Sequence, residues 1–330
     1  MVSICIPCYN NVSEVERLLV SIHKQNYADY EVNISDDSTN EETADLVGHV
    51  IAEWNWQDKL HYIHNVKPLG HIYNWNAAIK MATGQYIKIM FSDDWFTDER
   101  SLGIFVNMLE EHPEASFAFS GSMQVLLDGQ AIDQVKHLSK QATEHGEAYA
   151  RYAEDAFIER LYRNYKLFFL GNQIGAPSAG IYRRGEQLVL FDEQSNWASD
   201  MFLYFDLLQA NHEFAYTKEP LISIGMHTNQ YTESFTERDM RIYNDYRYLY
   251  TKYGLQDCEE CREYFTENFI IKYHQGLKEA KALGIDSKMY WKKWWTEQKN
   301  TVKCFVTHRF QLLCNLSLIH ISEPTRPISI

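Results

Sequence analysis

The stretch YIKIMFSDDW, residues 86–95, leads from an apolar run directly into two adjacent carboxylates. The run has the β-branched and aromatic composition of a buried strand, expected over residues 85–91. Gly84, just before it, is expected to end the preceding helix. Asp93 and Asp94 repel each other, so either water solvates both or a cation lies between them. The stretch therefore predicts a core strand that ends in a polar site.

The same alternation of strand and helix extends through the first 120 residues. Strands are expected at 2–7, 30–35, 60–64, 85–91 and 115–119, and helices at 13–25, 41–54, 71–83 and 98–111. Strands that alternate with helices of this length predict an α/β fold with a mostly parallel sheet flanked by helices. Ligands of such sheets bind outside the carboxyl ends of the strands.

The pattern changes after residue 120. We expect an Asp-Gly hairpin near residue 128, a loop at 134–146, helices at 149–165 and 199–210, and strands at 179–183 and 220–227. Helices are then expected at 233–253, 259–283 and 287–299. The chain therefore divides into a main domain over 1–230, with halves 1–120 and 121–230, and a helical extension over 231–315. Residues 316–330, LSLIHISEPTRPISI, look like a translated sequencing-library adapter and are expected to be a non-native tail.

Composition narrows the class of protein. The 330 residues are 45% hydrophobic, enough for a sizeable core, and the formal net charge is −14 with no block of Lys or Arg. A nucleic-acid partner is therefore not expected, and an anionic ligand would need a metal or local donors. Six cysteines in a chain of this length do not form a disulfide framework, and Cys258-x-x-Cys261 has no second pair at zinc spacing. With no basic segment before Val2 and no apolar run of about 20 residues, we expect a cytoplasmic protein.

Polar residues follow three of the expected strands. Tyr9 follows the first strand, Asp36 and Asp37 follow the second, and Asp93 and Asp94 follow the strand that ends at residue 91. Because the carboxyl ends of parallel strands meet at one edge of a sheet, these side chains are expected to converge. The topology alone thus predicts a site at that edge.

Four segments in order resemble family-2 glycosyltransferases of the bacterial surface-polysaccharide type. They are VSICIPCYNN (2–11), ISDDSTNEET (34–43), LGHIYNWNAAIKMATGQYIKIMFSDDW (69–95) and WASDMFLYFDLL (197–208). The resemblance covers roughly residues 1–230 and implies the Rossmann-like GT-A fold of nucleotide-diphospho-sugar transferases. It assigns the nucleotide sugar to the half 1–120 and the acceptor side to the half 121–230.

The resemblance also implies a nucleotide site. Tyr9 would lie against the base through stacking of two π-faces, and Asp37 would accept a hydrogen bond from a pyrimidine ring N–H. Alternatively, Tyr9 packs under its own loop, and the polar residues after the second strand are ordinary turn formers and helix caps. The full nucleotide-binding set is Pro7, Tyr9, Asn10, Asp36, Asp37, Gly70, Asn76, Ser92 and Asp93.

In the family, the segment around Asp93 is a D-x-D motif that holds Mn²⁺ or Mg²⁺ against the two phosphates of the donor. Asp93 matches the metal-binding Asp, and Asp94 and His227 are the further candidate ligands. Phe91 stands where the motif has its first Asp, and Trp75 stands where many relatives have Arg. The alternative is that the two carboxylates favour a following helix N-terminus.

Asp200 matches the catalytic base of the family, with Ser199 in place of the usual Glu. An inverting transfer needs one carboxylate that takes the proton of the acceptor hydroxyl, opposite the departing diphosphate. Trp197 would stack on an acceptor sugar. Alternatively, Asp200 favours the positive end of its helix dipole.

The resemblance implies an inverting transferase that moves a sugar from a UDP or dTDP donor to a hydroxyl of a glycan or lipid-linked acceptor. The Trp- and Lys-rich segment 288–299 is typical of a helix on an anionic bilayer at the inner face of the plasma membrane, or of a helical cap. A dehydrogenase is excluded because PCYNNVSEV lacks phosphate-binding glycines. A sugar-phosphate nucleotidyltransferase is excluded because its Gly-rich, Arg-containing first loop is missing. The remaining alternative is a non-catalytic nucleotide-sugar-binding relative or scaffold.

Overall fold

The computed structural model describes residues 1–127, 148–228, 230–236 and 238–299. The chain forms two compact units, Met1–Leu249 and Tyr250–Ile330. The expected Asp-Gly hairpin turn, the loop 134–146 and the tail 316–330 lie outside the described residues. No described helix is both long enough and apolar enough to cross a bilayer.

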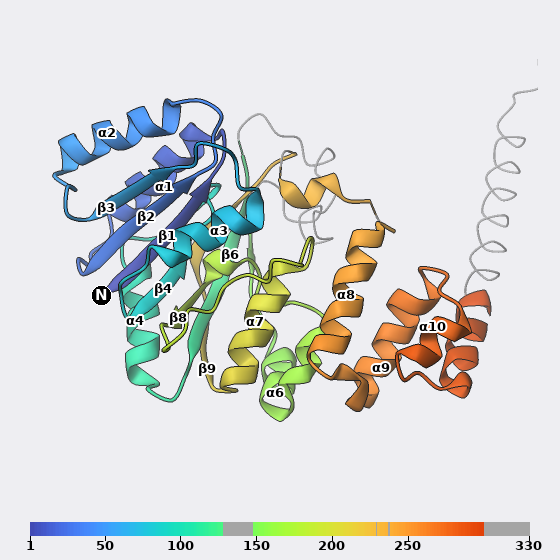
Figure 1. Cartoon of the computed structure of the whole chain (residues 1–330). Helices are drawn as coiled ribbons and strands as arrows, with labels where there is room; N and C mark the ends of the chain where they lie inside the picture. The colour runs from blue at the N-terminus through green and yellow to red at the C-terminus, as the bar shows by residue number, and fades with distance from the viewer. Residues whose placement is uncertain (128–147, 229, 237, 300–330) are drawn as a thin grey trace, which may run out of the picture. The chain divides into compact units, whose positions relative to one another are not determined.

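The first unit follows the predicted alternation of strands and helices closely up to β4 (Figure 1). Its elements are β1 Val2–Cys8, α1 Val12–His23, β2 Tyr30–Asp36, α2 Glu42–Trp54, β3 Leu60–His64, α3 His71–Lys80, β4 Tyr86–Ile89, β5 Asp94–Phe96, α4 Ser101–Glu111, β6 Phe117–Leu126, β7 Ala148–Arg151, α6 Asp155–Arg163, β8 Gly180–Arg183, α7 Ser199–Ala210, β9 Phe214–Met226 and the start of α8 Met240–Lys252.

These strands form one nine-stranded sheet in the order β3-β2-β1-β4-β8-β6-β9-β5, with β7 paired to β6. The run β3-β2-β1-β4 is parallel, as predicted. The other half is mixed, because β8 pairs antiparallel with β4 and β6, and β5 pairs antiparallel with β9. The expectation of a mostly parallel sheet is thus right only for the first half.

The main core cluster lies against both halves of the sheet. Every residue of β1 and β2 is buried, as expected for strands covered on both faces. The apolar faces of α1, α2 and α4 pack into the same cluster, through residues such as Leu18, Val47 and Phe105. This core holds the carboxyl ends of β1, β2 and β4 in place.

Some boundaries differ from the sequence prediction. Helix α3 ends at Lys80 with a right-handed C-cap, so Gly84 does not terminate it. Gly84 is instead required by close packing, because a Cβ there would lie 2.8 Å from the Met1 carbonyl oxygen. The helix expected at 149–165 divides into β7 and α6, and its first residues pair with β6 as an edge strand.

The described part of the second unit, up to residue 299, is helical, as predicted. Its elements are α9 Glu259–Phe265, the π-helical turn Thr266–Ile271, α10 Leu277–Ala282 and a helix over 287–299. The helix expected at 259–283 is therefore interrupted. Cys258 and Cys261 are buried and form no disulfide among the described residues.

Candidate active site

The turn that follows β4 places the two adjacent aspartates in different environments. The chain turns after Ile89, with the Asp94 N–H donating to the Phe91 carbonyl at 3.0 Å, and returns as β5 beside β9. Asp93 has a side chain 23% exposed, whereas Asp94 is 2% exposed. The Asp93 carboxylate is therefore partly accessible to solvent, whereas the Asp94 carboxylate is buried.

Asp94 belongs to the interior. The Ser178 hydroxyl and the Gly225 N–H donate to its carboxylate, and the buried Lys88 ammonium lies nearby. Burial raises the pKa of Asp94 well above its usual value, and burial lowers the pKa of Lys88 well below its own. Lys88 itself donates to the carbonyl oxygens of Ser178 and Gly180. Asp94 is therefore more deeply buried than Asp93, yet it also lines the cavity, and its role as a metal ligand stays a prediction.

Asp93 faces a cavity together with His227. Nε2 of His227 lies 3.2 Å from Oδ2 of Asp93. The Arg17 guanidinium donates to the Asp93 carbonyl at 3.0 Å and stacks on the Trp95 ring at 4.3 Å, which fixes the turn. Gly225 allows β9 to pass this turn, because a Cβ there would lie 2.5 Å from the Asp93 carbonyl oxygen.

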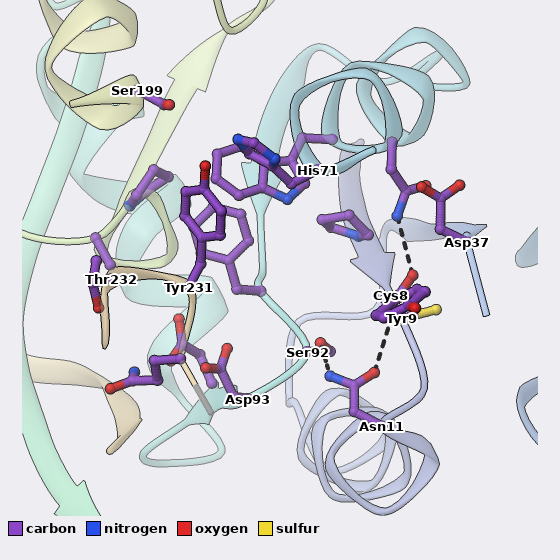
Figure 2. A pocket seen from close by; sticks show the side chains of 18 of the residues that line it. Cys8, Tyr9, Asn11, Asp37, His71, Ser92, Asp93, Ser199, Tyr231 and Thr232 are labelled. Carbon is purple, nitrogen blue, oxygen red and sulfur yellow. Dashed lines mark hydrogen bonds between the residues drawn. The ribbon is translucent and has the colours of Figure 1, made fainter. Parts of the chain in front are cut away.

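A second group of residues comes from the ends of β1 and β2. Tyr9 is 55% exposed at the cavity rim. Asp37 accepts hydrogen bonds from Asn65 at 2.8 Å and from the Gly70 N–H at 2.9 Å. Asn11 accepts from the Tyr9 N–H and donates to the Ser92 hydroxyl, so it joins this group to the turn beside Asp93 (Figure 2).

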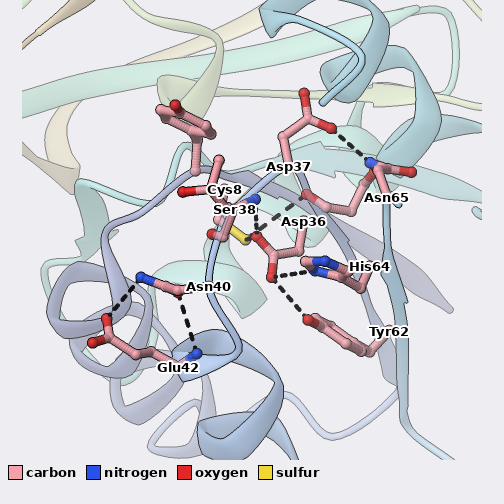
Figure 3. Close-up of polar contacts among 12 residues, drawn as sticks. Cys8, Asp36, Asp37, Ser38, Asn40, Glu42, Tyr62, His64 and Asn65 are labelled. Carbon is pink, nitrogen blue, oxygen red and sulfur yellow. Dashed lines mark hydrogen bonds and ion pairs between the residues drawn. The ribbon is translucent and has the colours of Figure 1, made fainter. Parts of the chain in front are cut away.

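Three predicted nucleotide-binding residues, Asn10, Asp36 and Asn76, do not line the cavity. Asp36 is fully buried and accepts from the Ser38 N–H and the Tyr62 hydroxyl, both at 2.8 Å (Figure 3). Burial opposes its ionisation, but these hydrogen bonds lower the pKa of Asp36. Asn76 is paired in both directions with the Phe191 backbone, and Asn10 accepts from the Thr39 N–H. The geometry therefore gives these three residues loop-shaping contacts.

Asp200 enters the cavity from the first turn of α7. Asn172 donates to its Oδ2 at 2.6 Å, and the Met201 N–H donates to its Oδ1 at 2.8 Å. Burial raises the pKa of Asp200 from 3.8 to about 6, against the opposing effect of these hydrogen bonds and of Arg151. At neutral pH the carboxylate is mostly ionised and remains a strong proton acceptor.

The loop before α7 is held by Asp245, which sequence analysis did not identify. Its Oδ2 accepts the N–H groups of Asn196, Trp197 and Ala198 at 2.9, 2.7 and 2.9 Å. Asp245 is 2% exposed and lies in α8, far from these residues in sequence. No local pattern could have indicated this contact.

These groups line one cavity of about 680 Å³. It contains every predicted site residue except Asn10, Asp36 and Asn76. Its charged lining residues are all carboxylates, and no Lys or Arg of the described chain contributes to it. The described residues also contain no cluster of three or more His, Cys, Asp or Glu able to hold a metal. Its lining includes Pro7, Tyr9, Asp37, Gly70, His71, Trp75, Phe91, Ser92, Asp93, Asp94, Trp197, Asp200, His227 and Tyr231.

Aromatic side chains form the middle of the cavity. His71 and Tyr231 lie with ring centroids 4.2 Å apart, between Asp37 and Ser199 in Figure 2. Trp75 contacts Phe91 at 4.7 Å. Burial lowers the pKa of His71, so its imidazole is neutral at pH 7. Sequence analysis left His71 and Tyr231 without a role.

The arrangement matches a known family. The family model for glycosyl transferase family 2 matches residues 3–173, just over half of the chain. The chain belongs to glycosyl transferase family 2. The fold and the family expected from the four sequence segments are thereby confirmed.

Curated relatives of this family 2 chain match over shorter regions. The abequosyltransferase RfbV of Salmonella typhimurium is 31% identical over 116 residues, 34% of each protein. The putative teichuronic acid biosynthesis glycosyltransferase TuaG of Bacillus subtilis is 24% identical over 143 residues, 43% of this chain and 55% of TuaG. The aligned regions thus span about a third to a half of these relatives.

Solved structures share the fold of this family 2 chain. S. aureus TarS 1–349 in complex with UDP-GlcNAc superposes with a TM-score of 0.56 at 16% identity, over 89% of this chain and 78% of TarS 1–349. The mannosyltransferase PcManGT of Pyrobaculum calidifontis, in complex with GDP-Man and Mn²⁺, superposes with a TM-score of 0.50 at 15% identity, over 94% and 87%. At this identity the likeness concerns the fold alone.

Proposed function

We propose that this chain is an inverting, metal-dependent glycosyltransferase. It would move a sugar from a nucleotide diphosphate donor to a hydroxyl of a glycan or lipid-linked acceptor in polysaccharide synthesis. One observation carries the proposal: Asp93 with His227, and Asp200 from a distant part of the chain, line the same cavity. An in-line displacement needs a site for the leaving diphosphate and a base for the acceptor within one cleft.

The donor nucleotide would lie at the end formed by Tyr9 and Asp37. The exposed Tyr9 ring offers a stacking face for the base. Asp37 is fixed by Asn65 and Gly70, yet each carboxylate oxygen keeps a free lone pair for a ring N–H. UDP or dTDP, which carry such a pyrimidine N–H, are the proposed nucleotides.

The diphosphate would lie beside Asp93 and His227. Two phosphates in a cavity whose charged described residues are all carboxylates need a cation for binding. Asp93 fits Mn²⁺ or Mg²⁺, which bind carboxylate and phosphate oxygens, and the His227 imidazole beside it favours Mn²⁺ over the harder Mg²⁺. When bound, the cation would neutralise the charge that develops on the departing diphosphate.

Asp200 would be the catalytic base. Its raised pKa of about 6 lets it accept a proton while it remains mostly ionised at neutral pH. Asn172 and the Met201 N–H fix the orientation of the carboxylate. Trp197, three residues earlier and also on the cavity wall, would stack on the acceptor sugar.

The relatives support the substrate class. TuaG is named for teichuronic acid biosynthesis and RfbV as an abequosyltransferase, and the TarS and PcManGT structures hold UDP-GlcNAc and GDP-Man with Mn²⁺. We place the reaction in the cytoplasm, where nucleotide sugars are made, and propose a peripheral membrane contact through residues 288–299.

The proposal is tested by donor hydrolysis. With Mn²⁺ and a panel of UDP- and dTDP-sugars, the protein should release nucleotide slowly to water. Asp93→Ala and Asp200→Asn should each reduce this release by at least about a hundredfold. Asp58→Asn, an exposed carboxylate outside the cavity, is the matched control and should have no effect.

The alternative is a non-catalytic nucleotide-sugar-binding relative or scaffold. It would bind nucleotide with Mn²⁺ and raise the melting temperature, yet show no release above background in any variant. A chain that neither binds nor hydrolyses any nucleotide sugar contradicts both functions.

A further inference from the structure

The wall between the nucleotide end and Asp200 is aromatic and uncharged. His71, Trp75, Phe91 and Tyr231 all line the cavity there. Trp75 contacts Phe91 at 4.7 Å and is supported from behind by Phe191 at 4.8 Å. Two of the three residues that depart from the family pattern, Trp75 and Phe91, are therefore direct neighbours.

The position of this wall identifies what it would contact. Figure 2 shows His71 and Tyr231 between Tyr9 and Asp37 on one side and Ser199 on the other. In the proposed function the nucleotide lies on the side of Tyr9 and Asp37. The catalytic base Asp200, which follows Ser199 in the sequence, lies on the other side. The group between them, in contact with the aromatic wall, is the donor sugar.

Few polar atoms on this wall can bind a hydroxyl. The neighbouring Asn74 already donates to the Cys8 carbonyl at 3.1 Å, and its oxygen accepts from Asn65 at 3.3 Å. Among the described residues that line the cavity, two buried side-chain atoms have no hydrogen-bond partner, Nε2 of His71 and Nε1 of Trp197. The wall can therefore satisfy a small number of sugar hydroxyls at fixed places, and none at the faces of the Trp75 and Phe91 rings.

We propose that the donor sugar is a deoxyhexose, with its deoxygenated carbon against Trp75 and Phe91. This inference rests on the proposed function. A hydroxyl placed on that surface would lose its water without gaining a partner, whereas a methyl or methylene group would bury apolar area. An added hydroxyl in an apolar pocket costs about ten- to a hundredfold in discrimination.

The test compares donors that differ only in hydroxyl groups. The donors are the UDP and dTDP derivatives of glucose and galactose and of the 6-deoxy and 3,6-dideoxy forms of these two sugars. Each donor is titrated into the full chain in the presence of Mn²⁺, and its affinity is measured by calorimetry. A deoxy donor should bind at least about tenfold more tightly than its parent. Equal or tighter binding of every parent sugar overturns the inference, while tight binding of the nucleotide part leaves the proposed function intact. Absence of binding by UDP, dTDP and all donors overturns both.

Variants of Phe91 test whether this wall sets the preference for deoxy donors over their parent sugars. Phe91→Asp should reduce the ratio of affinities for the deoxy and parent donors by about tenfold, because the carboxylate supplies an acceptor for the extra hydroxyl. Phe91→Leu, which keeps the surface apolar, should retain the ratio. Equal ratios in the two variants would show that Phe91 does not set the preference. Trp75→Phe and Trp75→Gln provide the same comparison should Phe91→Asp not fold.

Discussion

Nε2 of His227 lies 3.2 Å from Oδ2 of Asp93, although the two residues are 134 positions apart in the chain. The pair joins the turn after β4 to the segment after β9. No third His, Cys, Asp or Glu completes a metal cluster within the described residues. A cation held by only two protein groups would complete its shell with water and with the phosphates of the donor.

Metal and nucleotide are therefore expected to bind together. Mn²⁺ alone should bind weakly, and saturating UDP or dTDP should raise its affinity by at least about tenfold, measured as free Mn²⁺ by electron paramagnetic resonance. His227→Ala should raise the Mn²⁺ concentration needed for activity by at least about tenfold. His49→Ala, at an exposed position of α2, is the control. Tight nucleotide-independent binding of Mn²⁺ would contradict the two-ligand site.

The pH dependence of activity should report Asp200. Its pKa of about 6 means that the carboxylate is protonated, and unable to accept a proton, in acid. We expect kcat/KM to rise tenfold per pH unit below about pH 6 and to level off above it. Asp200→Glu should retain part of the activity and shift this pH limb. An unchanged limb in the variant would assign the titration to another group.

The same pKa has a consequence for stability. The folded-state pKa of Asp200 lies above its ordinary value of 3.8, so the protein loses stability as pH rises from about 4 to about 6. The difference corresponds to at most about 3 kcal/mol. Asp200→Asn should therefore be inactive but more stable than the wild type at pH 8, with the gain lost at pH 4. Denaturant melts at both pH values measure this crossover.

Asp245 is expected to position the proposed base Asp200 and the proposed acceptor contact Trp197. It accepts three consecutive backbone N–H groups that lead into α7. Asp245→Ala leaves these donors unpaired in a buried place and should cost about 2–4 kcal/mol of unfolding free energy. Asp245→Asn should remain folded and lower kcat by at least about tenfold, with little effect on the KM for the nucleotide donor. A variant that changes stability alone, with kcat intact, would make Asp245 purely structural.

Two glycines provide a matched pair of substitutions. Gly225→Ala would place a Cβ 2.5 Å from the Asp93 carbonyl oxygen, a backbone atom that cannot move aside. We expect it to lose about 1–3 kcal/mol of stability and most metal-dependent activity. Gly48→Ala, within α2 and with no atom within 4 Å of the new Cβ, should instead gain about 0.5–1 kcal/mol. Equal effects of the two substitutions on Mn²⁺ dependence would exclude this role of Gly225.

Much of the first half could be predicted from sequence because its signals are local. Alternating periods of 2 and 3.6 located β1 to β4 and their helices, and the parallel-sheet rule placed Tyr9, Asp37 and Asp93 at one edge. The mixed half was not predictable in this way. Strand β8 has only four residues, and its antiparallel pairing between β4 and β6 depends on tertiary contacts.

In the candidate site, too, residues with local sequence signals could be predicted and residues that depend on tertiary contacts could not. Motif spacing identified Asp93, Asp200 and His227, which all line the cavity. Motif spacing could not separate Asp93 from Asp94, because the difference arises from the burial of Asp94, which follows from the register of β5 on β9. Asp245 and the aromatic contact between His71 and Tyr231 bring together distant segments, so no short pattern contains them.

The predicted membrane contact involves the second unit. On the helix over 287–299, Trp291 and Trp295 are 46% and 59% exposed at a spacing of four residues, which places them on one face. Lys293 forms ion pairs with Glu263 and Glu267, so its charge is largely neutralised within the unit. The exposed tryptophans are therefore expected to supply most of the membrane affinity.

Sedimentation with vesicles of stated composition tests this prediction. The full chain should bind vesicles that contain phosphatidylserine, and Trp291→Ala with Trp295→Ala should weaken binding by about tenfold or more. Tyr73→Ala, which removes a half-exposed aromatic side chain in the first unit, is the matched control. Binding that depends strongly on salt but not on the tryptophans would point to the lysines instead. Absence of vesicle binding by the wild type would leave the helix as a packed cap whose exposed rings have no membrane role.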